Sequence, residues 1–169
     1  RRQRQMCIRD STNTGKTSLL RTLLRDGGFG EVADASATTR HVERAAVCDD
    51  DGTLLYLYDT PGLEDAGGVL DWLEANTSPR EDGVDRLQAF LASPVAAGEF
   101  GQEAKVLRQL LQSDSALYVI DAREPVLNKY KDELTVLSWC AKPLMPVFNF
   151  TSGGGLSAWT DMLARRGLH

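Results

Sequence analysis

Residues 12–18, Thr-Asn-Thr-Gly-Lys-Thr-Ser, are residue types that bind a nucleotide polyphosphate. They supply the second half of the pattern G-x-x-x-x-G-K-[ST] and stand just before a leucine-faced helical segment, as that pattern requires. Backbone N–H groups of such a loop converge on the phosphates, and its lysine adds positive charge at the β- and γ-phosphates. The hydroxyl of Thr17 can ligate Mg²⁺. The candidate nucleotide-binding residues here are Asn13, Thr14, Gly15, Lys16, Thr17 and Ser18.

Asp10 departs from this pattern because it takes the place of the first glycine. A side chain crowds the tight turn at that position, and a carboxylate repels phosphates. We therefore expect weaker phosphate binding than a complete loop provides. The alternative interpretation of this segment is a chance Gly-Lys-Thr at the start of a helix.

The segment Asp59-Thr60-Pro61-Gly62 follows directly on an apolar, strand-like segment. Asp59 is thus expected at the carboxyl end of a strand, where it can hold Mg²⁺ through water opposite Lys16. Gly62 has no side chain, so its backbone N–H can approach a γ-phosphate. The alternative is an ordinary Asp-x-Pro-Gly turn after a strand.

Apolar segments that alternate with helical ones predict an α/β domain with a mostly parallel sheet. The segments on either side of the turn-forming residues 49–52 are expected to form a hairpin, and residues 54–58, which are apolar throughout, to be buried on both faces. Helices are expected over residues 16–25, 128–140 and 156–166, and strands over residues 41–48, 53–59, 116–121 and 144–149.

In order along residues 12–62, the motifs GKTS, TTR and DTPG resemble the Era and TrmE-like branch of P-loop GTPases. The segments LLRTLLRD, YDTPGLED and KPLMPVFNF are similar to a group of bacterial GTPases with a further C-terminal domain of unknown function. The resemblance implies a three-layer P-loop NTPase sandwich with one antiparallel strand, ending here before its last strand and helix. It further implies GTP and GDP as ligands, Mg²⁺ held by Thr17, Thr39 and Asp59, and an effector protein.

The resemblance also assigns hydrolytic roles. Thr39 is the switch I threonine that senses Mg²⁺ and the γ-phosphate, and it is the candidate catalytic residue. Asn13 matches an asparagine that related GTPases use to hold K⁺, and its alternative is a turn asparagine. Leu63 stands where a Ras-like chain has a glutamine that orients the attacking water, so we expect slow hydrolysis.

Guanine recognition is altered relative to this family. The family motif N-K-x-D is replaced by Asn149-Phe150-Thr151-Ser152. Asn149 is retained as a candidate nucleotide-binding residue and Phe150 can stack on the base, but Ser152 lacks the carboxylate that makes two hydrogen bonds to guanine. A GTP-binding regulatory domain is therefore one hypothesis, and an ATP-binding or nucleotide-promiscuous P-loop protein is a second. A non-catalytic interaction module with a degenerate loop is the third.

Composition limits the partners and the location. Nineteen Lys and Arg against 24 Asp and Glu give a net charge of −5, and a basic stripe with interleaved aromatics is absent outside the N-terminus, so the sequence does not support nucleic-acid binding. No apolar segment reaches the roughly 18 residues needed to span a bilayer. Three cysteines without a CxxC pair favour a reducing compartment, and we expect a cytoplasmic protein.

Domain boundaries are expected at one end and inside the chain. Residues 1–10 are rich in arginine and resemble translated sequencing-adapter sequence, so we interpret them as a non-native leader. Residues 11–169 then form one G domain that is incomplete at its C-terminal end. The interval between the DTPG motif and the next strand is longer than one crossover helix needs, which indicates a helical insertion at about residues 64–112.

Overall fold

The computed structural model describes residues 4–10, 16–24, 43–49 and 52–168. Their elements, in chain order, are β1 (Arg4–Asp10), α1 (Lys16–Leu24), β2 (Glu43–Asp49), β3 (Gly52–Asp59), α2 (Ala66–Asn76), α3 (Gly83–Ala92), the 3-10 turn η2 (Pro94–Ala96), α4 (Gly101–Gln112), β4 (Ser115–Asp121), α5 (Asn128–Ser138), β5 (Leu144–Asn149) and α6 (Leu156–Ala164).

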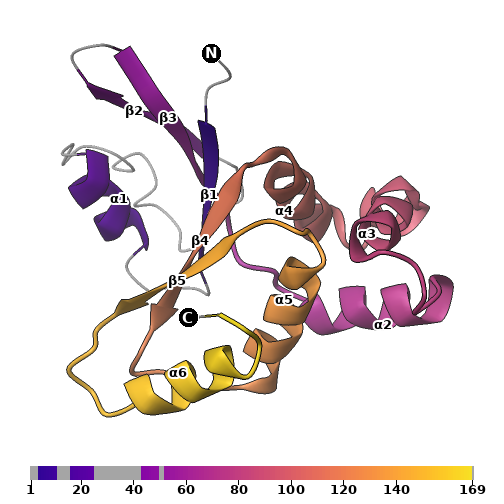
Figure 1. Ribbon diagram of the computed structural model, residues 1–169. Coiled ribbons are helices and arrows are strands. Elements are labelled where there is room, and N and C mark those ends of the chain that lie inside the picture. The colour runs from indigo at the N-terminus through magenta and orange to yellow at the C-terminus, as the bar shows by residue number, and fades with distance from the viewer. Residues whose placement is uncertain (1–3, 11–15, 25–42, 50–51, 169) are drawn as a thin grey trace.

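The five described strands form one sheet in the order β2-β3-β1-β4-β5 (Figure 1). β1 pairs in parallel with both β3 and β4, and β4 pairs in parallel with β5. Only the β2–β3 hairpin is antiparallel among these pairs. The predicted α/β class, with a mostly parallel sheet and one antiparallel strand, is therefore confirmed. All four parallel strands end at the same edge, where a ligand site is expected in such sheets.

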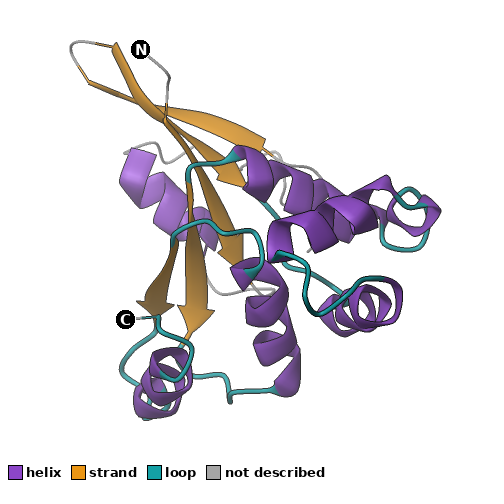
Figure 2. Cartoon of the chain, turned by 45° about the vertical axis from the view of Figure 1, so that its right-hand side comes forward, coloured by secondary structure: helices purple, strands orange, loops and turns teal. Residues whose placement is uncertain are grey.

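Helices cover both faces of the sheet because neighbouring strand residues point to opposite sides. Cys7 packs in the core beneath α2–α6, whereas the next residue, Ile8, packs with Leu20 of α1 on the other side. Tyr118 and Val119 divide in the same way between the two cores. Figure 2 shows α1 on one side of the sheet and the remaining helices on the other. This is the predicted three-layer sandwich.

The segment 4–10 lies at the centre of the sheet, although sequence analysis sets residues 1–10 apart from the domain. Cys7, Ile8 and Arg9 are fully buried there. The arginine-rich composition of this segment does not indicate a buried strand. Its one fully buried arginine, Arg9, forms an ion pair with the carboxylate of Glu133. In the structure the domain therefore includes residues 4–10. That the first ten residues are not native stays a prediction.

The hairpin strand β3 is less buried than residues 54–58 predict. Leu57 is buried, but Leu55, Tyr56 and Tyr58 are only half-buried. β3 has the edge strand β2 on one side, so less of the molecule covers it than covers β1 or β4. The guanidinium of Arg44 on β2 covers one face of the Tyr56 ring at 4.7 Å from its centre.

Residues 66–112 contain three α-helices and a 3-10 turn, all in the layer opposite α1 (Figure 2). α2 packs against α5, and the residue before it, Asp65, caps its N-terminus by accepting a side-chain hydrogen bond from the backbone N–H of Gly68. An edge-to-face contact between Trp72 and Phe90 joins α2 to α3. This layer places α2 and α4 beside the loop that follows β3. Among the described residues, no helix has both the length and the apolar character needed to cross a bilayer.

Candidate nucleotide-binding site

Lys16 and Asp59 meet at the carboxyl edge of the sheet. Lys16 is the first residue of α1 and Asp59 the last of β3, and both side chains are buried. The Lys16 ammonium donates a hydrogen bond to a carboxylate oxygen of Asp59. The two residues that sequence analysis assigned to phosphate and to Mg²⁺ therefore face the same space.

The strand pairing places Asp59 in this position. Asp59 is in register with Ile8 of β1, and the next residue, Thr60, donates two hydrogen bonds to the carbonyl of Ile8, each of 3.0 Å. One comes from its backbone N–H and one from its hydroxyl. Thr60 is fully buried, so these bonds fix the chain as it leaves the sheet toward Gly62.

Part of the predicted site lies outside the described residues. Asn13, Thr14, Gly15 and Thr39 belong to it, and with them the expectations for K⁺ and for the switch I threonine. Thr17 follows Lys16 in the first turn of α1, but its side chain is likewise outside the description. The proposed roles of these residues stay predictions.

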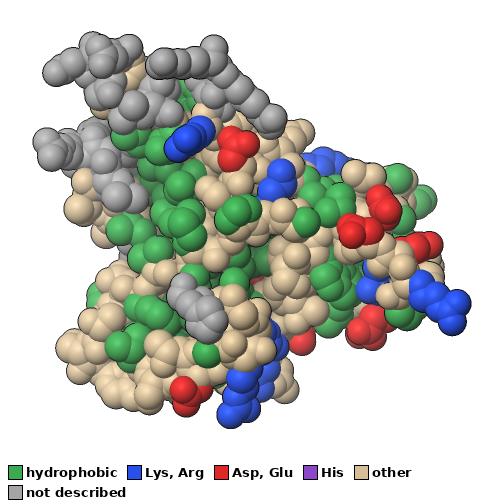
Figure 3. Space-filling view, in the orientation of Figure 1, with side chains coloured by type: hydrophobic (Ala, Val, Ile, Leu, Met, Phe, Trp, Pro, Cys, Tyr) green, Lys and Arg blue, Asp and Glu red, His purple; other side chains and the backbone are tan. Residues whose placement is uncertain are grey.

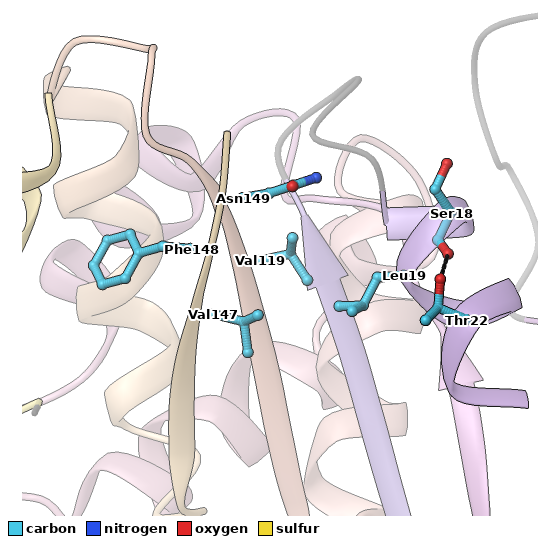
Figure 4. A pocket seen from close by; sticks show the side chains of 7 residues that line it. All are labelled: Ser18, Leu19, Thr22, Val119, Val147, Phe148 and Asn149. Atoms are coloured by element: carbon cyan, nitrogen blue, oxygen red, sulfur yellow. Dashed lines mark hydrogen bonds between the residues drawn. The ribbon is translucent and has the colours of Figure 1, made fainter. Parts of the chain in front are cut away.

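A pocket of about 220 Å³ separates α1 from β4 and β5 (Figure 4). Leu19, Val119 and Val147 give it apolar walls, and the predicted binding residues Ser18 and Asn149 line it together. Sites that bury a whole small ligand usually measure roughly 300–1,000 Å³. The pocket is therefore large enough for only part of a nucleotide. The pocket lies between Asn149, the predicted base-binding residue, and α1, the helix that follows the predicted phosphate loop.

The loop after β4 and the residue after β5 contact each other. Arg123 makes a bidentate ion pair with Asp121, with a shortest distance of 2.6 Å, and its hydrogen bonds hold the pKa of the Asp121 carboxyl below its ordinary value. The same guanidinium stacks on the ring of Phe150 at 3.8 Å from its centre. Phe150 has a positive φ of 55°, and its N–H bonds to Asn149 Oδ1 at 3.0 Å. Phe150 is 39% exposed beside the predicted base residue.

A family model described as a 50S ribosome-binding GTPase matches residues 6–150. The chain belongs to this GTPase family. Members of the family are GTP-binding P-loop proteins, which agrees with the resemblance carried by the GKTS, TTR and DTPG motifs. The matched region begins inside β1 and ends one residue beyond Asn149. A comparison with curated proteins found no match.

Solved structures show that the GTPase has the Era fold. A variant of Aquifex aeolicus Era bound to GDP·AlF4⁻ has a TM-score of 0.58 and 18% identity, and the match covers 97% of this chain and 48% of Era. Era in complex with MgGDPNP and a 16S ribosomal RNA segment has a TM-score of 0.59 and 17% identity, and the match covers 96% of this chain and 46% of Era. A protein from Thermus thermophilus has a TM-score of 0.59 and 18% identity, and the match covers 97% of this chain and 22% of that protein. The GTPase thus spans about half the length of the two Era chains.

Two buried glutamates beside the site escaped the sequence interpretation. Glu133 on α5 accepts a hydrogen bond from the backbone N–H of Leu63, and Glu103 on α4 accepts one from the N–H of Asp65, each at 3.0 Å. Both carboxylates occupy positions on the buried face of their helix, Glu133 between Tyr130 and the leucines of α5. A glutamate within an apolar helical stripe is the signal that would have found them.

Surface charge does not form one continuous patch on the face shown in Figure 3. Lys and Arg side chains of the described residues lie there in separate places, several of them beside Asp or Glu.

Proposed function

We propose that this GTPase domain binds GTP and GDP with Mg²⁺, hydrolyses GTP slowly, and acts as a regulatory domain for an effector protein in the cytoplasm. The contact between Lys16 and Asp59 is the observation that carries the proposal. A phosphate-binding lysine and a metal-binding aspartate must face the same ligand, and these two side chains already touch.

The residues at this edge fit a magnesium ion. Mg²⁺ prefers oxygen ligands, and Asp59 presents a buried carboxylate next to the start of α1, which carries Thr17. Asp59 and Thr17 would hold the ion, with Thr39 as the third predicted contact. When bound, Mg²⁺ supplies positive charge against the phosphate oxygens. The chain itself contributes the Lys16 ammonium and the N-terminus of α1, both of which favour anionic oxygens.

Slow hydrolysis follows from the segment after Gly62. Leu63 has an aliphatic side chain, which cannot orient a water molecule, and its backbone N–H is already bonded to Glu133. Preference for the guanine base is inferred from the family and not from this motif, because Ser152 replaces the family aspartate and only Asn149 is retained. Potassium, if Asn13 binds it, would accelerate the reaction by adding positive charge in the transition state.

Phosphate release from GTP with Mg²⁺ tests the proposed reaction. We expect turnover well below the usual 1–10³ s⁻¹ of enzymes. Lys16→Ala should abolish it, whereas Lys105→Ala should leave it unchanged, since Lys105 is exposed on α4 and bonds only to Gln102 among the described contacts. Replacing Na⁺ by K⁺ in the same assay tests the role of Asn13. Equal release from both lysine variants would refute the assignment of Lys16.

A further inference from the structure

The chain between β3 and α2 is held at both ends by buried groups. At its start, Thr60 donates two hydrogen bonds to the carbonyl of Ile8. At its end, Leu63 and Asp65 donate backbone N–H bonds to Glu133 and Glu103. Gly62 lies between these anchors, so its backbone is confined from both directions.

Glu133 accepts hydrogen bonds from three donors. Its Oε1 accepts from Leu63 N and from Arg9 Nη2, and its Oε2 accepts from the Tyr118 hydroxyl at 2.8 Å. Burial, and next the adjoining carboxylate, raise the pKa of Tyr118 well above its ordinary value, so the hydroxyl keeps its proton and remains a donor. Hydrogen bonds to a charged acceptor contribute more than neutral ones, and in a buried network each bond limits the movement of the others.

Glu103 on α4 holds the end of the same segment with a second buried carboxylate. Its side chain is 4% exposed and its carboxylate reaches the N–H of Asp65. Asp65 in turn accepts from Gly68 N at 2.8 Å and so fixes the first turn of α2. A Cβ at Gly68 would lie 2.9 Å from the Phe100 ring, which leaves little room for this turn to shift.

We propose that Glu133 and Glu103 are positioning residues that hold segment 62–65 so that the backbone N–H of Gly62 meets a γ-phosphate. The inference rests on the proposed function, because only a nucleoside triphosphate presents that phosphate. Holding the backbone in advance removes an ordering cost from GTP binding and leaves GDP binding unaffected. The two anchors therefore favour GTP over GDP.

Variants that differ only in the acceptor test this positioning. Arg9 must be changed first, because its buried guanidinium would otherwise lose its carboxylate. In an Arg9→Met background, Glu133→Gln keeps an oxygen for Leu63 N and Glu133→Leu removes it. Glu103→Gln and Glu103→Leu form the second matched pair. Thermal unfolding of each variant checks that the fold is retained.

Amide hydrogen exchange measured by NMR tests the hydrogen bonds of Leu63 N–H and Asp65 N–H directly, and it needs no nucleotide. We expect the Leu63 amide to exchange at least about tenfold faster with Leu than with Gln at position 133. The Asp65 amide should respond in the same way to the pair at position 103. Equal exchange in the matched variants would overturn the anchoring role.

The dissociation constants of GTP, a non-hydrolysable GTP analogue and GDP test whether the two glutamates affect γ-phosphate binding. With leucine at either position, the dissociation constants for both triphosphates should rise about tenfold relative to the glutamine variant, and that for GDP by less than about twofold. A parallel loss for GDP would show general damage to packing and would overturn the proposal. If the unaltered chain binds no nucleotide, the proposed function and the phosphate contact both fail, and the exchange data still decide whether the glutamates hold the segment.

Discussion

The ammonium of Lys16 donates to the carboxylate of Asp59 across a separation of 43 residues. The contact joins the start of α1 to the end of β3, and it occurs because both elements flank β1 at the same edge of the sheet. Under the proposed function, each of these two charges therefore affects how the other meets phosphate or metal.

Asp59→Asn should remove most of the dependence of GDP binding on Mg²⁺. The amide keeps the shape of the carboxylate but loses its charge, so Lys16 becomes available to phosphate while the metal loses a ligand. We expect Mg²⁺ to increase the GDP affinity of the unaltered chain at least about tenfold more than that of the variant. Titrations with Mg²⁺ and with chelator measure this. The same gain from Mg²⁺ in both proteins would contradict it.

Glu133→Leu should destabilise the fold by about 3–5 kcal/mol, because it leaves the buried Arg9 charge without its carboxylate. Arg9→Met should cost less, since two guanidinium nitrogens, Nε and Nη1, are buried without a hydrogen-bond partner among the described residues. The double variant should recover the part of the loss that comes from the Arg9 charge, while the Tyr118 hydroxyl and Leu63 N–H still lack their acceptor. Denaturant unfolding of the three variants provides the test, and additive losses in the double variant would contradict the pairing.

Unfolding free energy should fall as the pH rises above about 9. Burial raises the pKa of the Cys140 thiol to about 12, from an ordinary value of 9.0. The unfolded chain then loses the proton first, so stability present below pH 9 decreases toward pH 12. Denaturant unfolding at pH 8 and pH 10 measures the decrease. Cys140→Ala should make the decrease shallower but not remove it, because burial also raises the pKa values of Cys7 and Tyr118. An unchanged slope in that variant would contradict the role of Cys140.

The three cysteines should differ in their rates of alkylation at pH 8. Cys48 on β2 is exposed, whereas Cys7 and Cys140 are buried and their thiol pKa values are raised by burial. Because the thiolate is the reactive form, we expect Cys48 to react at once and the other two only on unfolding. Mass spectrometry of peptides from a timed iodoacetamide reaction shows the order. Rapid modification of Cys7 would contradict the burial of β1.

Gly155→Ala should destabilise the loop after β5 by about 1–3 kcal/mol, because an added Cβ would collide with the backbone carbonyl of Ala122. Gly154→Ala is the matched control, since its Cβ would meet nothing within 4 Å. We expect that variant to stay within about 0.5 kcal/mol of the unaltered chain. Thermal unfolding distinguishes them, and equal stabilities would show that the loop moves freely away from Ala122.

The sequence predicts the regular elements well where local pattern determines them. The β2–β3 hairpin, β4, β5 and the helices α1, α5 and α6 lie where periodicity places them, with ends that differ by a few residues. Lys16 and Asp59 could be paired from sequence because Lys16 begins the helix after the phosphate loop and Asp59 ends a strand, and both positions lie at the carboxyl edge of a parallel sheet.

Long-range polar contacts could not be predicted in this way. The strand β1 is not predicted from sequence, because the arginine-rich composition of residues 1–10 sets them apart from the domain. The burial of Arg9 becomes favourable only through its partner Glu133 on α5. The bonds from Leu63 to Glu133 and from Asp65 to Glu103 depend on how α4 and α5 pack, which no local pattern encodes. Such contacts join residues 38 to 124 positions apart.

Nucleotide competition tests the central claim, that Lys16 is part of a guanine-nucleotide site. Fluorescent GDP with Mg²⁺ is bound to the chain and displaced by GTP or ATP, with Lys16→Ala and Lys105→Ala as paired variants. We expect displacement by GTP at far lower concentrations than by ATP, no binding by Lys16→Ala, and unchanged binding by Lys105→Ala. An Asp10→Gly form should bind more tightly, because its loop regains the glycine of the pattern. Absence of binding in both the unaltered and Asp10→Gly forms, or equal displacement by ATP, would show that Lys16 is not part of a guanine-nucleotide site.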